Sequence, residues 1–140
     1  MKLEVKIISF VALISFGFAR FAYSEATLKY EPSVVELQGK LSLQEFPGPP
    51  EYESIARGDK PERFWILTLR SPVRVVADPD DELMQTQDDV KEIQLVCLSG
   101  CGERFSFFVG EAITLTGTLF TAHSGHHHKS VLMVVINKKE

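Results

Sequence analysis

Four histidines lie in the segment "AHSGHHHKSVLMVV", from Ala122 to Val135, and the chain has no others. They are His123, His126, His127 and His128. Neutral imidazole is the commonest protein ligand for zinc and copper, and so short a segment gives a high local concentration of it. A terminal tag is excluded, because the β-branched run that follows is typical of a buried strand. The segment therefore predicts either a transition-metal site, for zinc or copper, or a loop shaped by imidazole hydrogen bonds.

The spacing of the histidines decides which of them can act together. If the segment is extended as it enters the last strand, His126 and His128 point to one side and His127 to the other. His123 can join either side across the loop. A metal site of His123, His126 and His128 is one interpretation; in the other, one or two rings hydrogen-bond to backbone and the rest face solvent.

A proline-rich segment, "FPGPPEYESIARGDKPER", holds the residues that would complete such a site. Its four prolines and two glycines predict a long, partly stiffened loop. A carboxylate from this loop can serve as a further metal ligand. The candidate ligand residues of the loop are Glu51, Tyr52, Glu53 and Asp59.

Alternation of apolar and polar residues predicts strands on both sides of this loop. The first strand covers Val35 to Leu43, and the second covers Phe64 to Leu69. Three later strands are predicted from "IQLVCL", "AITLTGTLFTA" and "SVLMVVIN". Between the third and fourth strands, "GERFSFFVGEA" predicts one or two helical turns that end at Gly110.

This order of elements predicts an all-β fold with little helix. A five-stranded Greek-key barrel of the OB-fold type has a short helix between its third and fourth strands. Gly39 and Gly117, at the same phase of "LQGKL" and "LTGTL", predict two matching bends of a curled sheet. In that fold the loops after strands one and four flank the binding face, so Tyr52 is expected to lie near the histidines.

The first residues have the pattern of a signal peptide. A basic start precedes an apolar run of thirteen residues, Ile7–Ala19, which is too short to cross a bilayer. Ala22 and Ser24 are the small residues that signal peptidase requires. We therefore expect residues 1–24 to be removed, leaving residues 25–140 as one domain without a membrane anchor, periplasmic or secreted.

Charge, the lack of a recognisable catalytic group and the number of cysteines limit the functions that this chain can have. The chain carries a net charge of −4, and an acidic exported domain is a poor binder of nucleic acid or anionic membranes. No nucleophile with an oriented base is recognisable, so an enzyme is not predicted. Cys97 and Cys101 are the only cysteines, and in an oxidising compartment a disulfide between them is expected.

Several segments together resemble a known family. "YEPSVVELQGKL", "FPGPPEYESIARGD" and "ITLTGTLFTAHSGHHHKSVLMVV" are similar to the bacterial exported family known as domain of unknown function 4431. The Pro-Gly-Pro-Pro loop and the Gly-His-His-His segment are the most specific parts. This chain has Ser124 and Lys129 where the family commonly has threonines, and its cysteines lie later in the chain, so no disulfide carries over. The resemblance implies no activity, substrate or catalytic residue.

Two function classes follow. The first is an exported binding domain that takes a transition metal or a small ligand at the His123–His128 loop. The second is a periplasmic protein-interaction or inhibitor domain that uses the loops 47–62 and 122–129, with structural histidines and a surface ordered in advance by prolines.

Overall fold

Six strands form one sheet in the computed structural model, which describes residues 25–100 and 102–139. The predicted signal peptide lies outside the described residues. One short α-helix and one 3-10 turn complete the elements found in those ranges. In chain order they are β1 (Ala26–Lys29), β2 (Val34–Pro47), η1 (Ile55–Arg57), β3 (Pro61–Val76), β4 (Gln87–Val96), α1 (Gly102–Ser106), β5 (Ala112–Thr121) and β6 (Val131–Lys138).

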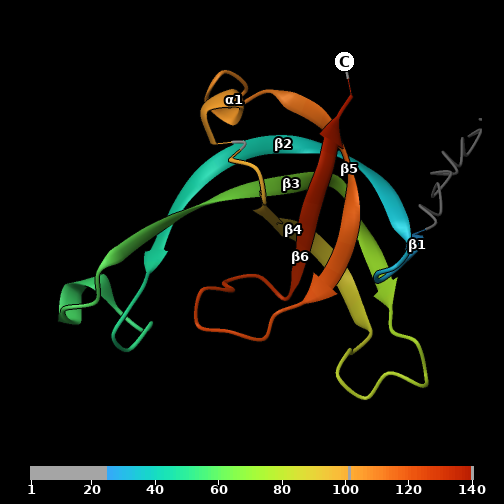
Figure 1. Cartoon of the computed structure of the whole chain (residues 1–140), viewed down its shortest axis with the longest axis horizontal. Helices are drawn as coiled ribbons and strands as arrows, with labels where there is room; N and C mark the ends of the chain where they lie inside the picture. Colours follow the sequence, from blue (N-terminus) through green and yellow to red (C-terminus); the bar gives the residue numbers. More distant parts are fainter. Residues whose placement is uncertain (1–24, 101, 140) are drawn as a thin grey trace, which may run out of the picture.

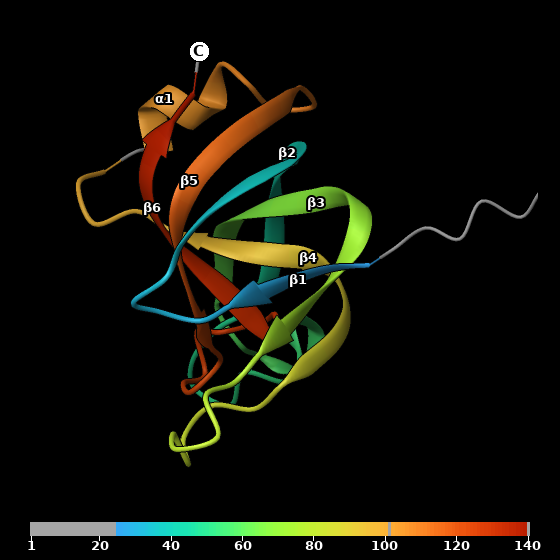
Figure 2. The ribbon, with the colours of Figure 1, turned by 90° about the vertical axis from the view of Figure 1, so that its right-hand side faces the viewer.

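The strand pairings form a closed circuit. The sheet order is β1-β3-β2-β5-β6-β4, and β4 pairs back with β3. β4 and β6 are parallel, while the other neighbours in the circuit are antiparallel. Figures 1 and 2 show the strands curving around a common interior, with α1 and the end of β6 at one end of the sheet. The predicted class, mainly β with a short helix, is confirmed.

Two glycines allow the sheet to curl where the sequence predicts bends. At Gly39, β2 passes from its pairing with β5 to its pairing with β3. A Cβ there would lie 2.5 Å from the carbonyl oxygen of Thr68. At Gly117 a Cβ would lie 2.2 Å from the carbonyl oxygen of Val134, beside a register shift between β5 and β6. Only glycine permits these close approaches of backbone.

The interior is filled by alternate residues of the strands. The side chains of these residues are fully buried. Burial of each one stabilises the folded state by roughly 1.5–3 kcal/mol. The fully buried core residues are Leu41, Leu67, Val75, Ile93, Leu115, Leu119, Val131 and Met133.

The structure differs from the prediction in two strands. β1 was not expected, because Ala26–Lys29 lacks clear alternation; its parallel pairing with residues 73–76 of β3 holds it. β3 runs from Pro61 to Val76, through Ser71 and Pro72, whereas the sequence predicts a strand that ends at Leu69. The β3–β4 pairing has a register shift between Thr68 and Val73, so the missing N–H of Pro72 falls where the ladder is interrupted.

α1 closes one end of the interior between β4 and β5. Phe105 is 3% exposed, and its ring meets the ring of Trp65 edge-on at 5.7 Å. The helix ends at Ser106, earlier than the predicted end at Gly110, and turns continue to Gly110. Gly110 has a φ of 84°, and its N–H donates to the carbonyl of Leu41. No helix in the described ranges is long and apolar enough to cross a membrane.

Candidate functional site

A row of side chains crosses the outer face of the sheet beneath the histidine loop. Pairing aligns Ile66 of β3 with Gln94 of β4, and Gln94 with Leu132 of β6. These three side chains are 0–1% exposed, although Ile66 and Leu132 lie outside the main core cluster. An outer face can be buried in this way only when something covers it, and at Gln94 the cover is the loop at 122–130, which bonds to its side chain.

Gln94 fixes this loop to the sheet. Its Nε2 donates to the carbonyl of His126 at 2.8 Å, and its Oε1 accepts from the N–H of His128 at 2.7 Å. A buried amide is stable only when its donors and acceptor are used, and here both ends are. Sequence reasoning missed Gln94, because a glutamine in a strand has the same pattern whether its face is covered or exposed.

His126 joins the histidine loop to the proline-rich loop. Its Nδ1 lies 2.8 Å from Oε2 of Glu62, and its Nε2 lies 3.3 Å from the hydroxyl of Tyr52. Because a carboxylate only accepts, Nδ1 carries the proton that bonds to Glu62. A Cβ on Gly125 would lie 2.9 Å from the ring of Tyr52, so the backbone is also in close contact. The predicted proximity of Tyr52 and the histidines is confirmed.

His128 packs as an aromatic ring. It stacks on Phe46, with ring centroids 4.5 Å apart, and lies 5.4 Å from the ring of Phe64. Its buried Nε2 has no hydrogen-bond partner among the described residues. Burial lowers the pKa of His128 below its ordinary value, and the nearby Glu62 carboxylate opposes this shift. The ring is therefore held in its neutral form.

His123 and His127 form a second pair on the β5 side. The backbone N–H of His123 donates to Nδ1 of His127 at 3.0 Å, and Nδ1 of His123 donates to the carbonyl of Thr121 at 3.0 Å. Both rings pack on Phe120, at 5.6 and 5.5 Å. Burial, and then the neighbouring histidines, lower the pKa of His127.

These contacts separate the residues of the predicted metal site. His126 faces Tyr52, His128 lies on Phe46, and His123 lies against His127. Across residues 25–100 and 102–139, no three His, Cys, Asp or Glu side chains are arranged to hold a metal ion. Binding of zinc or copper stays a prediction, and it would require these rings to turn out of their present contacts.

Asp59 organises the proline-rich loop instead of reaching a histidine. Its carboxylate accepts from the backbone N–H groups of Glu51 at 2.9 Å, Glu53 at 2.8 Å and Ser54 at 2.7 Å. These bonds hold the pKa of Asp59 below its usual value, and the side chain is 7% exposed. The carboxylate that meets a histidine belongs to Glu62, at the start of β3, which the sequence did not single out.

The rest of the proline-rich loop is closed by backbone. The N–H of Gly48 donates to the backbone carbonyl of Lys60 at 2.7 Å, and the N–H of Lys60 donates to the backbone carbonyl of Pro49 at 2.9 Å. The side chain of Glu53 pairs with Arg57 at 2.8 Å on the surface. The loop is therefore ordered by its own hydrogen bonds as well as by the contact with the histidines.

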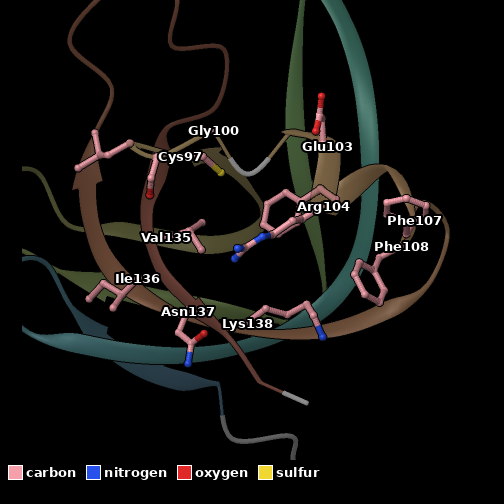
Figure 3. A pocket seen from close by; sticks show the side chains of 13 residues that line it. Cys97, Gly100, Glu103, Arg104, Phe107, Phe108, Val135, Ile136, Asn137 and Lys138 are labelled. Atoms are coloured by element: carbon pink, nitrogen blue, oxygen red, sulfur yellow. The ribbon is translucent and has the colours of Figure 1, made fainter.

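Of the two cysteines of the predicted disulfide, the structure describes Cys97. Cys97 directly follows β4, three residues after Gln94, and lines a cavity beside α1 (Figure 3). Cys101 is outside the described residues, so a bond between the two cysteines stays a prediction.

Comparison with known proteins gives one match. Residues 92–138 match the family model described as Domain of unknown function (DUF4431). The match confirms the resemblance over this segment, which contains Gln94 and all four histidines but not the loop at 47–62. No curated protein and no solved structure matches the chain.

Proposed function

We propose that this chain is an exported binding domain with an OB-fold that docks a protein partner on its loop surface, the loops 47–62 and 122–129 taken together. The circuit β2-β3-β4-β6-β5, the parallel β4–β6 pair and the position of α1 support the OB-fold. The two loops then correspond to those that flank the binding face in this fold. β1 is an addition at the edge.

The observation that carries the proposal is that hydrogen bonds and ring contacts join the two loops directly to each other. Tyr52 and Glu62 hold His126, and Gln94 holds the backbone on both sides of His127. A surface that is ordered before binding loses less conformational entropy when a partner docks. In this proposal the histidines are structural, and the loop surface they order is the functional feature.

The outer face of the sheet is not left open for a ligand. In OB-folds that bind oligonucleotides or saccharides, the face of strands two and three is a binding surface. Here Ile66 and Gln94 of those strands are buried, and Gln94 is hydrogen-bonded to the backbone of the histidine loop. A partner therefore meets the outside of the loops, where Ile55 is 40% exposed next to the ion pair of Glu53 and Arg57. This pattern suits a protein surface with a small apolar pocket and charged rim.

The experiment is partner capture with matched variants. The untagged mature domain is coupled to beads and exposed to an envelope extract of its host, beside Ile55→Glu and Leu83→Glu. Leu83 is 87% exposed in the loop between β3 and β4, outside the two loops of the proposed surface, so it controls for an added charge at an exposed apolar site. We expect one stoichiometric partner that the Leu83 variant retains and the Ile55 variant loses, with Kd raised at least about tenfold for the purified pair.

Two results contradict the proposal. Equal capture by both variants would remove the loop surface as the docking site. About one equivalent of zinc or copper in protein purified without metal chromatography, lost in His126→Ala/His128→Ala, would make the loop a metal site instead. The mass of the protein recovered from the extracytoplasmic fraction tests export and the removal of residues 1–24.

A further inference from the structure

A cavity of about 780 Å³ lies between β6, α1 and the turn after β4. It is at the opposite end of the sheet from the loop surface (Figure 1), and its lining is drawn in Figure 3. Nothing in the proposed function uses this end of the molecule. Residues that matter to its chemistry are Leu98, Arg104, Phe107, Phe108, Ile136 and Lys138.

One wall of the cavity is an unpaired strand edge. β6 pairs with β4 only from Leu132 to Val134, and beyond that its outer edge has no strand partner among the described residues. Residues 135–138 of this edge line the cavity. Such an edge presents backbone N–H and C=O groups at the repeat of an extended chain, and peptides that add a strand use these groups for affinity.

The rim of the cavity is apolar and exposed. Leu98 is 81% exposed, Phe107 is 82% exposed and Ile136 is 62% exposed. Figure 3 shows Ile136 and Phe107 on opposite sides of the cavity, so exposed apolar side chains are spread along its rim. Exposed apolar surface beside a cavity is typical of an interaction site. These side chains offer contacts to alternate side chains of a bound strand.

The charge inside the cavity is positive. Arg104 extends across it toward β6 (Figure 3), and its guanidinium makes no ion pair or hydrogen bond with a described residue. Lys138 also lines the cavity, with Nζ 4.5 Å from the ring centroid of Phe108. The carboxylate of Glu103 points away from Arg104. In a chain of net charge −4 this is a local site for a carboxylate.

We propose that this cavity binds an extended peptide segment of a protein, which adds a strand to the free edge of β6. An acidic side chain of the peptide pairs with Arg104, and apolar side chains of the peptide pack on Leu98 and on Phe107. The site is separate from the loop surface, so the domain has a peptide site at one end and a docking surface at the other.

The test uses three capped, fluorescein-labelled hexapeptides and fluorescence anisotropy. The first alternates Val and Asp, the second alternates Val and Lys, and the third is the first with N-methyl groups on alternate amides. We expect the acidic peptide to bind at least about tenfold more tightly than the other two. Arg104→Gln should weaken it about tenfold, whereas Arg70→Gln, which alters an exposed arginine of β3 outside the cavity, should not.

Several results overturn the proposal. Equal affinity for acidic and basic peptides would remove the role of Arg104, and tight binding of the N-methylated peptide would remove strand addition. Absence of binding by all three peptides up to about 1 mM, or a dimer that forms through β6 and is lost in Asn137→Pro, would also overturn it. Ile55→Glu should leave peptide affinity unchanged, which separates this site from the loop surface.

Discussion

The imidazole ring of His128 lies flat on the phenyl ring of Phe46, with centroids 4.5 Å apart and planes 7° from parallel. One nitrogen of that imidazole is buried without a hydrogen-bond partner among the described residues. His128 therefore contributes to the fold through the packing of its ring, and its Nε2 forms no hydrogen bond with a described residue.

Replacement of His128 by phenylalanine should therefore be tolerated. His128→Phe keeps the stack and removes an unpaired polar atom, so the free energy of unfolding should stay the same or rise by up to about 1 kcal/mol. His128→Ala removes the ring and should lower it by about 2 kcal/mol. Urea denaturation followed by the fluorescence of Trp65, the only tryptophan, measures both. Equal losses in the two variants would mean that the ring nitrogen is used.

Loss of the Gln94 side chain should release the histidine loop. Gln94→Ala leaves the carbonyl of His126 and the N–H of His128 without partners, which costs about 2–3 kcal/mol of unfolding free energy. Amide hydrogen exchange at His128 should become faster as well. Gln38→Ala, on the exposed side of β2, is the control. If His128 exchanges at the same rate in both variants, Gln94 does not hold the loop.

Strand positions were predictable because alternation reports burial on one face. Val35, Leu37 and Leu41 alternate with polar residues, and all three are buried. The same alternation predicts that Gln94 faces solvent. A strand pattern contains no information on whether a loop from a distant part of the chain covers that face. β1 escaped prediction for a similar reason: its stability comes from β3, not from its own residues.

In the candidate site, residue types were informative and their partners were not. That Tyr52 lies near the histidines follows from the order of strands, which brings the two loops to one end; that its partner is His126 does not. The carboxylate that bonds to the histidine could not be predicted from the sequence. The carboxylate of Asp59 already accepts hydrogen bonds from three backbone N–H groups of its own loop. Glu62 is left to meet the histidine, and only the folded geometry of the loop distinguishes these two acids.

Acid should destabilise the protein in a first step that belongs to the histidines. Burial lowers the pKa of His127 and His128 below 6.5, so the unfolded chain takes up protons at a higher pH than the folded chain. Their contribution to stability is complete above about pH 6.5 and falls as the pH drops below it. Unfolding free energies from about pH 8 to about pH 5 should show this slope, reduced in His127→Gln/His128→Phe.

A second acid step should belong to two carboxylates. Backbone hydrogen bonds lower the pKa of Asp59, and the hydrogen bond from Lys129 lowers that of Glu92. Groups of this kind stabilise the fold above their ordinary pKa values and lose that effect as the pH falls through the lowered ones. The step should therefore lie below about pH 4.5 and persist in the histidine variant. If the loss of stability below about pH 4.5 were absent in His127→Gln/His128→Phe, this step would not belong to Asp59 and Glu92.

Gly117 should not accept a side chain. In Gly117→Ala the new Cβ would lie 2.2 Å from the carbonyl oxygen of Val134, so β5 and β6 must separate, and we expect a loss of at least about 3 kcal/mol. Gly102→Ala is the matched control, because its nearest neighbour, Nε1 of Trp65, is 3.8 Å away and alanine favours the helix. Thermal unfolding of both variants decides the question, and similar melting temperatures would contradict the close approach.

The length of β2 has a consequence for how the chain can be divided. Residues 34–40 pair with β5 and residues 39–47 pair with β3, so a single strand is held by partners from both halves of the sequence. A cut in the loop at 77–86 would leave β2 and β3 on one fragment and β4, α1, β5 and β6 on the other. Neither fragment has the neighbours that its strands need, and each should be unfolded alone. Mixed together, the fragments would reconstitute the domain, so its folding and the association of the two pieces would be the same event.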